Sequence, residues 1–444
     1  MLVLKPIYTS FFYMKTTVQK LQSFVGQEVT LSGWLTNSRS SGPIMFLELR
    51  DGSGFIQAIV NKAEVAPEVW ADAEKLTQES SLSVTGLVKA HPKKEGVYEI
   101  QVSGIHIYNV AAEYPIANKE HGPDFLMEHR HLWLRSKRQW AILRIRDVIE
   151  TAINDYLHQE GFIRTDSPIF TPNACEGTTT LFGMPYFDLG SAYLSQSGQL
   201  YSEAAIFSAG RVYDFGPVFR AEKSKTKRHL TEFWMMDAEA AFVEHDENMD
   251  IQEGLIKFIV RAALEKCTAE FAVLERDTAP LQKLLDLPFS RLTYDEAIPK
   301  LNALGSDINY GEDLGNDDEG LLTKDSAVPV FIHRWPKAIK PFYVKRAADN
   351  DALALNVDLI GIEGSGEIIG GAQREEDINL LLERIKAEGL NEEDYDWYLD
   401  LRKFGSVPHS GFGVGVERVV RWLTQAEHIR ECIPFPRLLN RIKP

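Results

Sequence analysis

The amino-acid sequence predicts an α+β protein, in which a small five-stranded β-barrel precedes a larger domain of antiparallel sheet flanked by helices. Three observations support this prediction. Short alternating strands fill residues 15–112, a segment rich in proline and glycine follows at 113–128, and strands mix with amphipathic helices over 129–444. The chain has 444 residues, 44% hydrophobic and 25% charged, which suits two or three globular domains with large cores.

Five short runs within residues 15–112 alternate apolar and polar residues or are briefly apolar, and turns separate them. They are EVTLSGWL, PIMFLELRD, GFIQAIVN, SLSVTGLVKA and YEIQVSGIHIY. A helical stretch, PEVWADAEKL, stands between the third and the fourth run. This order favours an OB-fold barrel, although a small β-domain without a role in nucleic-acid binding fits the pattern equally well. Residues 1–14 are interpreted as a leader, because they lack the basic start and cleavage site of a signal peptide.

The hinge predicted at 113–128 precedes a helix and then a mixture of strands and helices. Apolar residues at three- and four-residue spacing mark the inward stripe of the first helix: Ile142, Ile145, Ile149, Ile153 and Leu157. FIRTDSPIF predicts a strand interrupted by Pro168. Further strands are expected at VYDFGPVF, EFWMMDAEAAF and GEIIGG, and helices at LLLERIKAEG and ERVVRWLTQAE. Their hairpin order favours a mainly antiparallel sheet.

The charge pattern limits the classes of partner. The formal net charge of −16 argues against a uniformly basic surface, but salt screens charges beyond about 10 Å, so local clusters can still bind an RNA. Basic residues gather at Arg130–Arg138, at Arg220–Arg228 and near the C-terminus. The acid-rich stretch EDLGNDDE, residues 312–319, is expected to be a solvated loop.

Cysteine usage and hydropathy predict the compartment. The three cysteines are far apart and lack metal-ligand spacing, which favours a reducing compartment and a cytoplasmic protein: Cys175, Cys267 and Cys432. No apolar run approaches the roughly 20 residues that cross a bilayer, so no membrane association is expected.

A hairpin at residues 216–242 carries the most informative chemistry. Its first strand ends at Arg220, and a basic loop leads to a second strand near Glu232. Side chains on one face of that second strand are an aromatic, a methionine and two carboxylates: Phe233, Met235, Asp237 and Glu239. A face of this composition beside an arginine predicts the floor of a ligand pocket. The alternative is a solvated face of an edge hairpin.

Two further segments contain residues that suit nucleotide phosphates. In HSGFGVGVERVVRW, residues 409–422, a glycine-rich strand runs into a helix whose first turn contains Arg418, an arrangement that favours anions. In DLIGIEGSGEIIGGAQR, Asp358 and Glu367 offer the hard oxygen ligands that Mg²⁺ prefers on ATP. Each signal is weak when taken alone.

Together, the segment ending at Pro168, the FRAE…RHLTEF hairpin and GFGVGVER resemble the three signature motifs of class II aminoacyl-tRNA synthetases. The order of the motifs and the preceding barrel are similar to the subgroup that contains the aspartyl, asparaginyl and lysyl enzymes. The resemblance covers almost the whole chain. It implies ATP and Mg²⁺ as cofactors and a homodimer with Pro168 at its interface.

The resemblance also implies a role for each motif residue. Arg220 is expected to bind the α-phosphate, and His229 and Arg418 the outer phosphates. Glu222 is expected near the adenine and Phe233 stacked on its ring, while Asp358 and Glu367 hold the metal. Arg220 and Arg418 are therefore the predicted catalytic residues.

Among the amino acids of this subgroup, the resemblance favours L-asparagine and hence tRNA(Asn). Glu176 and Gln199 resemble the residues that hold the substrate α-amino group, and Arg374 resembles the arginine that meets its side chain. Ser202 stands where aspartyl enzymes carry a lysine, which removes a cation that would balance a substrate carboxylate. Asp237 departs from the glutamate of bacterial asparaginyl enzymes and argues for aspartate.

Three alternatives remain open at this point. They are an aspartyl-tRNA synthetase, one that serves both tRNAs included, an asparagine synthetase on the same catalytic fold, and a non-catalytic RNA-binding relative. The barrel argues against the second, and the retained motif arginines argue against the third. In the barrel, Phe46, Gln57 and Glu99 resemble the residues that stack on and hydrogen-bond the central anticodon uridine. Asparagine and aspartate anticodons share that uridine, so these residues do not discriminate between the two.

Overall fold

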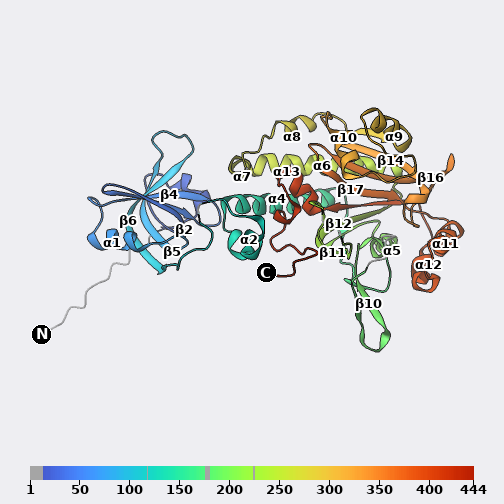
Figure 1. The fold of residues 1–444 in the computed structure, drawn as a ribbon, viewed down its shortest axis with the longest axis horizontal. Helices are drawn as coiled ribbons and strands as arrows, with labels where there is room; N and C mark the ends of the chain where they lie inside the picture. The colour runs from blue at the N-terminus through green and yellow to red at the C-terminus, as the bar shows by residue number, and fades with distance from the viewer. Residues whose placement is uncertain (1–13, 118, 176–180, 224–225) are drawn as a thin grey trace. The chain divides into compact units, whose positions relative to one another are not determined.

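The structure is a computed structural model, and it describes residues 14–117, 119–175, 181–223 and 226–444 (Figure 1). The chain divides between Pro123 and Asp124 into two compact units. The hinge expected at 113–128 spans this division. None of the helices in the described part of the chain has both the length and the apolar character needed to cross a bilayer.

The N-terminal unit is a closed β-barrel, as predicted. Its strands follow the order β2–β3–β4–β6–β5, and β5 pairs again with β2 to close the ring. They are β2 (Glu28–Ser41), β3 (Ile44–Arg50), β4 (Phe55–Asn61), β5 (Ser81–Ala90) and β6 (Tyr98–Asn109). Alternate residues point inward, so that Leu31, Leu47 and Val84 are fully buried.

Two short helices and one short strand complete the barrel unit. The predicted helix α1 (Pro67–Lys75) stands between β4 and β5, and the 3₁₀ helix η1 (Val18–Phe24) precedes β2. Strand β1 (Met14–Lys15) runs parallel to β2. Met14, which was expected to end the leader, therefore belongs to the barrel sheet. The remainder of that expected leader, residues 1–13, lies outside the described residues.

The second unit is built on a nine-stranded sheet in which antiparallel pairing predominates, which confirms the predicted fold class. Its order is β13–β14–β16–β17–β18–β12–β11–β7, with β15 paired to β16. Only the β13–β14 and β7–β11 pairs are parallel within this sheet. The strands are β7 (Ile163–Arg164), β11 (Arg211–Phe219), β12 (Glu232–Ala241), β13 (Ser290–Thr293), β14 (Val330–Pro336), β15 (Arg346–Ala347), β16 (Asn350–Gly361), β17 (Gly366–Gln373) and β18 (His409–Gly415).

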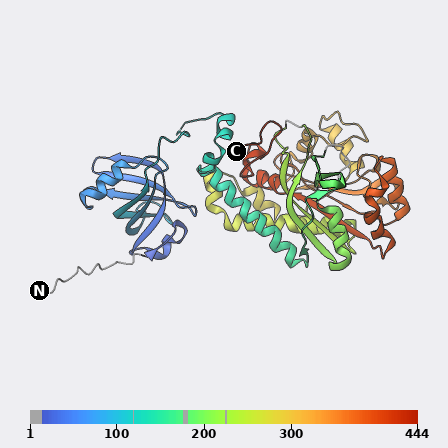
Figure 2. The same cartoon turned by 90° about the horizontal axis from the view of Figure 1, so that it is seen from below.

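Long helices bury one face of this sheet. The predicted helix is α4 (Lys137–Gln159), and all five residues of its expected stripe are at most 2% exposed. Figure 2 shows α4 beside α6 (His245–Lys266), and α13 (Val416–Thr424) packs on both α4 and the sheet. Met236 and Ala238 of β12 join the same apolar core. The opposite face of β12 is consequently left for polar side chains.

The segment FIRTDSPIF does not form one interrupted strand. Its first part is β7 at the edge of the large sheet, whereas its second part, β8 (Phe170–Thr171), belongs to a separate three-stranded sheet. Pro168 lies between them and is exposed. A proline has no N–H to donate and fixes its own φ, so the chain leaves one sheet before entering the other.

The remaining elements cover the ends and the second face of the sheet. The small sheet is completed by β9 (Gly183–Pro185) and β10 (Ser191–Leu194), which project as an arm in Figure 1. The other helices are α2 (Pro123–Glu128), α3 (Arg130–Trp133), α5 (Gln199–Ala209), α7 (Thr268–Val273), α8 (Ala279–Leu284), α9 (Tyr294–Ala303), α10 (Asn316–Thr323), α11 (Ile378–Ala387) and α12 (Asp396–Lys403). Four more 3₁₀ helices are η2 (Phe187–Leu189), η3 (Lys337–Ile339), η4 (Glu392–Tyr395) and η5 (Ile429–Glu431).

Arg130, the first residue of a predicted basic cluster, has a structural position. Its side chain is 1% exposed and donates to the carbonyl oxygens of Pro434 and Ile433, each at 2.8 Å, and to Gln139 Oε1 at 2.8 Å. The guanidinium thereby ties the C-terminal segment to the start of α4. Arg130 is therefore not part of an exposed RNA-binding surface.

His245, at the start of α6, is a buried histidine whose protonation opposes folding. It is 8% exposed, and its Nε2 lies 3.1 Å from Nδ1 of His333. Burial, followed by the nearby His333, lowers its pKa from 6.5 to about 4. Between these values the unfolded chain binds more protons than the folded one, so stability present above pH 6.5 is lost as the pH falls toward 4.

When the pH falls from 7 to 4, we expect the free energy of unfolding of His245→Asn to decrease by about 2–3 kcal/mol less than that of the unmodified protein. Urea unfolding followed at several pH values measures this difference. Equal pH slopes for the two proteins would contradict the assignment.

Candidate active site

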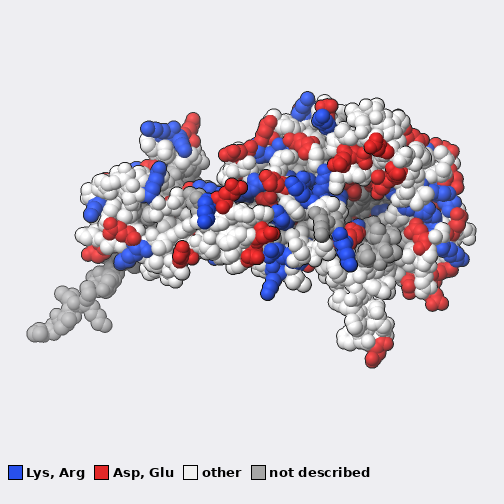
Figure 3. Space-filling model, in the orientation of Figure 1, with Lys and Arg blue, Asp and Glu red and all other residues white. Residues whose placement is uncertain are grey.

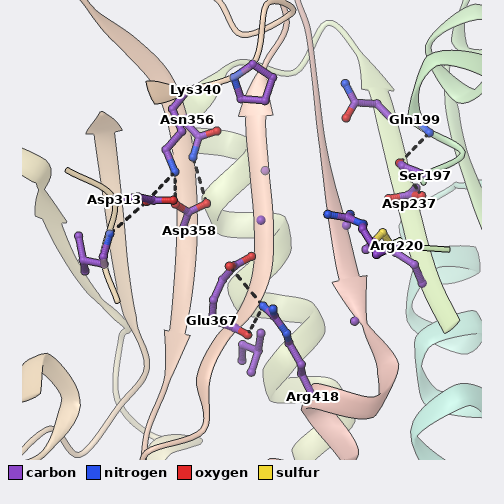
Figure 4. A pocket seen from close by; sticks show the side chains of 18 of the residues that line it. Ser197, Gln199, Arg220, Asp237, Asp313, Lys340, Asn356, Asp358, Glu367 and Arg418 are labelled. Atoms are coloured by element: carbon purple, nitrogen blue, oxygen red, sulfur yellow. Dashed lines mark hydrogen bonds and ion pairs between the residues drawn. The ribbon is translucent and has the colours of Figure 1, made fainter. Parts of the chain in front are cut away.

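A cavity of about 690 Å³ opens on the polar face of the large sheet. Side chains from β12, β16, β17, β18 and the first turn of α13 line it, and Figure 4 shows how they face one another. Phe233, Met235 and Asp237 of β12 are among them, as predicted for the floor of a pocket. The alternative of a solvated edge hairpin is wrong, because β12 is an inner strand paired with β11 and β18.

The glycines of the HSGFGVG strand make room for the carboxylates of β12. Gly413 lies opposite Asp237 in the β12–β18 register, and Gly411 lies opposite Glu239. A Cβ added at Gly413 would come within 2.7 Å of Asp237 Oδ1, and one at Gly411 within 2.0 Å of Glu239 Oε1. Only glycine therefore lets these two side chains lie across the neighbouring strand.

Arg220 and Arg418 both line the cavity (Figure 4), and each follows a strand end that lies beside the N-terminal part of β12. Arg220 follows β11, and its Cζ lies 5.9 Å from the centre of the Phe233 ring. Arg418 stands in the first turn of α13, where its Nη1 donates to the Glu367 carbonyl at 2.9 Å. Two permanent cations and one aromatic face thus share a single cavity.

Other predicted nucleotide contacts line the same cavity. Glu222 and His229, from the loop between β11 and β12, are both lining residues. Burial, with a further contribution from Arg418, lowers the pKa of His229 below its ordinary value. His229 therefore joins the arginines as a polar contact that carries no obligatory charge.

The carboxylates of Asp358 and Glu367 both lie near Gly370. A Cβ atom added at Gly370 would be 3.7 Å from Asp358 Oδ1 and 3.1 Å from Glu367 Oε1. Burial raises the pKa of Asp358 to about 6. Burial also acts on Glu367, but Arg418 and Lys340 together lower its pKa. Among the described residues no group of three His, Cys, Asp or Glu side chains could hold a metal ion alone. Two carboxylates suit a divalent cation that takes its other ligands from phosphate and water.

Lys340 and the acid-rich stretch contribute side chains that the sequence did not single out. Lys340 Nζ lies 2.9 Å from Asp358 Oδ2 and 3.6 Å from Asp313 Oδ1. Glu319, on α10, pairs with Arg228 at 2.7 Å, and burial followed by the neighbouring Glu367 raises its pKa to about 7. The expectation of a solvated loop holds for 312–315, which form no helix or strand and are mostly exposed, but α10 begins at Asn316. Glu319 is largely buried and lines the cavity because α10 packs against β16 and β17, whereas the exposed Asp313 lines it from the preceding loop.

The far end of the cavity holds the residues expected to bind the amino acid. Asp237 Oδ2 accepts hydrogen bonds from Ser197 Oγ and the Gly198 N–H, each at 2.9 Å. Gln199 and Arg374 also line the cavity. Arg374 donates through Nε to Glu239 Oε2 at 3.2 Å and through Nη2 to Glu239 Oε1. Arg374, a hydrogen-bond donor, and Asp237, an acceptor, therefore line the same cavity.

Ser202, predicted to contact the amino acid, is not found there. Ser202 is 1% exposed and is not among the lining residues. Ser202 lies on α5, three residues after Gln199. Glu176 lies outside the described residues.

Glu417, beside Arg418, has a structural role. It is 1% exposed, accepts from Arg146 Nη1 at 2.7 Å, and accepts from the Trp234 N–H at 3.1 Å. One carboxylate thereby ties α13 to α4 and to β12. The strand that carries the cavity floor is fixed to the helices that bury its other face.

The three predicted anticodon residues lie together on one face of the barrel. Gln57 of β4 is the register partner of Glu99 on β6, and Arg39 Cζ lies 4.7 Å from the centre of the Phe46 ring. Arg39 also donates to Gln57 Oε1 at 3.4 Å. An aromatic ring, an amide and a carboxylate are thus adjacent, as recognition of an unstacked base requires. Figure 3 shows basic and acidic side chains interspersed over the face in view, without a continuous basic surface.

Comparisons with known proteins agree with this geometry. Residues 122–439 match the family of class II tRNA synthetases (D, K and N), and residues 29–108 match the OB-fold nucleic acid binding domain. The asparaginyl-tRNA synthetase from Pyrococcus horikoshii complexed with asparaginyl-adenylate is 41% identical, with a TM-score of 0.92 over 97% of this chain and 99% of that one.

Two further solved structures extend the comparison. The asparaginyl-tRNA synthetase from Entamoeba histolytica in complex with asparaginyl-adenylate is 31% identical, with a TM-score of 0.86 over 97% of this chain and 100% of that one. The aspartyl-tRNA synthetase from the same organism is 29% identical, with a TM-score of 0.83 over 99% and 94%. With two arginines converging on one cavity and an OB-fold barrel ahead of it, the chain belongs to the class II aminoacyl-tRNA synthetases of the D, K and N family.

Proposed function

We propose that this enzyme activates L-asparagine with ATP and transfers the asparaginyl group to tRNA(Asn). The observation that carries the proposal is that Arg374 and Asp237 line the same cavity. The amide of asparagine has a carbonyl oxygen for the Arg374 donors and an NH₂ group for the Asp237 acceptor. The similarity to solved asparaginyl enzymes over nearly the full chain supports the same choice.

The chain's own residues account for the first half-reaction. The substrate carboxylate is ionised at neutral pH, so it attacks the α-phosphorus of ATP without a general base and pyrophosphate leaves. We assign charge neutralisation at the α-phosphate to Arg220 and binding of the outer phosphates to His229 and Arg418, because all three line the cavity. These groups lower the barrier by positioning and by electrostatic stabilisation. The terminal ribose hydroxyl of the tRNA then takes the acyl group.

Mg²⁺ fits the two carboxylates over Gly370. Asp358 and Glu367 supply hard oxygen ligands, and the remaining positions suit phosphate oxygens and water. When bound there, the ion would neutralise phosphate charge and orient the triphosphate. Lys340 would then exchange its contact with Asp358 for another partner in the cavity.

Charge, more than shape, separates asparagine from aspartate, since the two side chains are nearly isosteric. An aspartate carboxylate would meet the Asp237 carboxylate without a proton to share. The shorter Asp237, in place of the expected glutamate, is held in position by Ser197 and Gly198. A specific observation favours the second candidate, an aspartyl enzyme, because aspartate at this position is the feature shared with that branch.

The product on the tRNA tests the proposal. We expect purified enzyme with ATP, Mg²⁺ and a mixture of the twenty amino acids to charge tRNA(Asn) with asparagine. Mass spectrometry of the aminoacyl-adenosine released by nuclease identifies the attached residue. Aspartyl-adenosine as the main product would overturn the proposal in favour of the second candidate.

The barrel is proposed to bind the anticodon of tRNA(Asn), with Phe46 stacked on its central uridine. We expect Phe46→Ala to raise the KM for tRNA by about 5- to 100-fold, since stacking of one base contributes about 1–3 kcal/mol. ATP–pyrophosphate exchange, which does not involve the tRNA, should remain at the level of the unmodified enzyme. A loss of exchange would show damage to the catalytic unit, and an unchanged KM would contradict the assignment of Phe46.

We also propose a homodimer with two-fold symmetry. Ile169 and Phe170 next to Pro168 are 42% and 50% exposed, and Ile163 on the edge strand β7 is 54% exposed. Exposed apolar side chains beside a free sheet edge are suited to contact with a second copy. Light scattering at micromolar concentration should give twice the mass of the chain, and Phe170→Asp should shift the mass toward the monomer. A monomeric unmodified protein would contradict this.

The compartment is inferred from the cysteines. Cys175, Cys267 and Cys432 are all buried, and none of the three forms a disulfide in the described part of the chain. Burial raises the pKa of Cys267 to about 12, which keeps that thiol protonated and unreactive. We therefore place the enzyme in a reducing compartment, the cytoplasm.

A further inference from the structure

Behind Arg374 lies a buried carboxylate to which no role has been assigned above. Glu203, on α5, is fully buried, and its Oε1 lies 3.8 Å from Arg374 Nε. Its Oε2 accepts from Tyr398 at 2.6 Å and from Arg402 Nη2 at 2.8 Å, both on α12. His409 Nε2 lies 3.1 Å from the same oxygen. A single carboxylate thus connects the side-chain end of the cavity to α12 and to the start of β18.

The ionised state of Glu203 is fixed by these neighbours. Burial alone would raise the pKa of this carboxyl, but Arg402, His409 and Arg374 together hold it well below its ordinary value. Glu239, on the other side of Arg374, accepts two hydrogen bonds from the same guanidinium. Arg374 is therefore enclosed by two carboxylates, while Arg402 supplies the second buried cation.

The sum of these charges bears on the substrate. Burial raises the pKa of Glu239 to about 8, against the opposing effect of Arg374. Above that pH, Arg374 and Arg402 contribute two positive charges, and Glu203 and Glu239 contribute two negative ones. The group is balanced, so Arg374 presents N–H donors to the cavity without a net positive field behind them. Low polarisability of the surroundings makes such a balance matter more than it would in water.

We propose that Glu203 determines amide-over-acid specificity by cancelling the charge that Arg374 would otherwise present to the substrate side chain. A neutral amide oxygen needs only the directed donors, whereas a carboxylate would be attracted by an uncompensated cation. When the positive field of Arg374 is cancelled, repulsion from the Asp237 carboxylate disfavours the binding of aspartate. The inference rests on the proposed function, and it places the discrimination at Glu203 instead of the adjacent Ser202.

Glu203 also orients Gln199, one turn earlier on α5. Gln199 Nε2 donates to Glu203 Oε1 at 3.0 Å. An ionised carboxylate can only accept, so the amide nitrogen of Gln199 must point toward it and the amide oxygen is turned away. That oxygen is then available to accept from the substrate α-ammonium group. Glu203 is thus a positioning residue for both ends of the amino acid.

The test is ATP–pyrophosphate exchange with asparagine and with aspartate at pH 9, above the pKa of about 8 to which burial raises Glu239. Glu203→Gln keeps the shape and removes the charge, and we expect it to raise the aspartate-to-asparagine ratio of kcat/KM by at least about tenfold. The change should appear in the KM for the amino acids, with the KM for ATP unaltered. The double variant Glu203→Gln/Arg402→Met restores the charge balance and should return the ratio toward that of the unmodified enzyme.

A matched control distinguishes the effect of the Glu203 charge on the ratio from the effect of removing a buried carboxylate elsewhere. Glu270, 4% exposed and paired with Arg144 on α4, is not among the cavity residues, so Glu270→Gln should leave the ratio unchanged. If Glu203→Gln does not fold, Arg402→Met alone must move the ratio in the opposite direction, further toward asparagine.

The outcomes are distinguishable. An unmodified enzyme that prefers aspartate overturns the proposed function and this inference with it. An enzyme that prefers asparagine, with an unmoved ratio in Glu203→Gln, overturns the inference alone. A ratio that shifts in the single variant and stays shifted in the double variant assigns the effect to shape and overturns the role of charge.

Discussion

Replacing Arg220 or Arg418 with alanine is expected to lower ATP–pyrophosphate exchange by about 10²–10³-fold each. Both guanidinium groups line one cavity, and in the proposed reaction each neutralises phosphate charge that accumulates as the α-phosphorus is attacked. Alanine removes a planar, permanently charged group that water does not replace. The loss should appear in kcat as well as in the KM for ATP.

Arg211, on the same strand that leads to Arg220, offers the control. It pairs with Glu247 at 3.1 Å near the surface and does not line the cavity. Arg211→Ala should leave exchange unchanged, and thermal unfolding should show that all three variants fold. Near-normal exchange in Arg220→Ala or Arg418→Ala would contradict the catalytic assignment.

Arg374→Leu is expected to have the second large effect, on stability as well as on activity. Arg374 is 3% exposed and is bonded to Glu239, with Glu203 at 3.8 Å. Removing the cation leaves two buried carboxylates without their shared partner, which costs about 3–5 kcal/mol. Exchange with asparagine should be lost even at temperatures where the variant is folded, because the amide oxygen has no donor.

The stability loss in Arg374→Leu should depend on pH in a defined direction. Burial raises the pKa of Glu239 to about 8 although Arg374 opposes it, so without the guanidinium this pKa rises further in the folded state. The folded variant therefore binds more protons above pH 8 than the folded unmodified protein does, and its stability deficit should shrink as the pH is lowered from 10 toward 7. Lys403→Leu, which breaks the exposed pair with Asp400, should cost only about 0–1 kcal/mol. Equal deficits in the two variants would contradict the description of the buried group.

Local periodicity was sufficient to predict the barrel strands, the stripe of α4 and the floor of the cavity. The alternation around Asp237 works because β12 is an inner strand whose two faces have different partners, the apolar core and the cavity. The segment around Pro168 was predicted as one strand, and the structure separates it into two sheets. Sequence alternation cannot show that separation, because each part continues the pattern locally.

The site residues that were not predicted from the sequence are those whose role depends on contacts with residues far away in the chain. Lys340 reaches Asp358 because β16 returns beside the segment that follows β14, and nothing in the local sequence marks the lysine. Glu203 is one turn from the predicted Gln199, yet its partners on α12 lie almost 200 positions later, at a separation of 199 residues for Arg402. Glu319 was predicted to be solvated because an acidic run is usually a surface feature, but its side chain is largely buried, whereas Asp313 is exposed as expected. Paired buried charges could be recognised only once the fold had brought their partners together.

The central claim, an enzyme that adenylates asparagine in the cavity between Arg220, Arg418 and Arg374, is tested most directly by ATP–pyrophosphate exchange with single amino acids. We expect asparagine to support exchange and aspartate to support it at least about 100-fold less efficiently, as a site that hydrogen-bonds the amide requires. Exchange supported better by aspartate, or by neither amino acid, would contradict it.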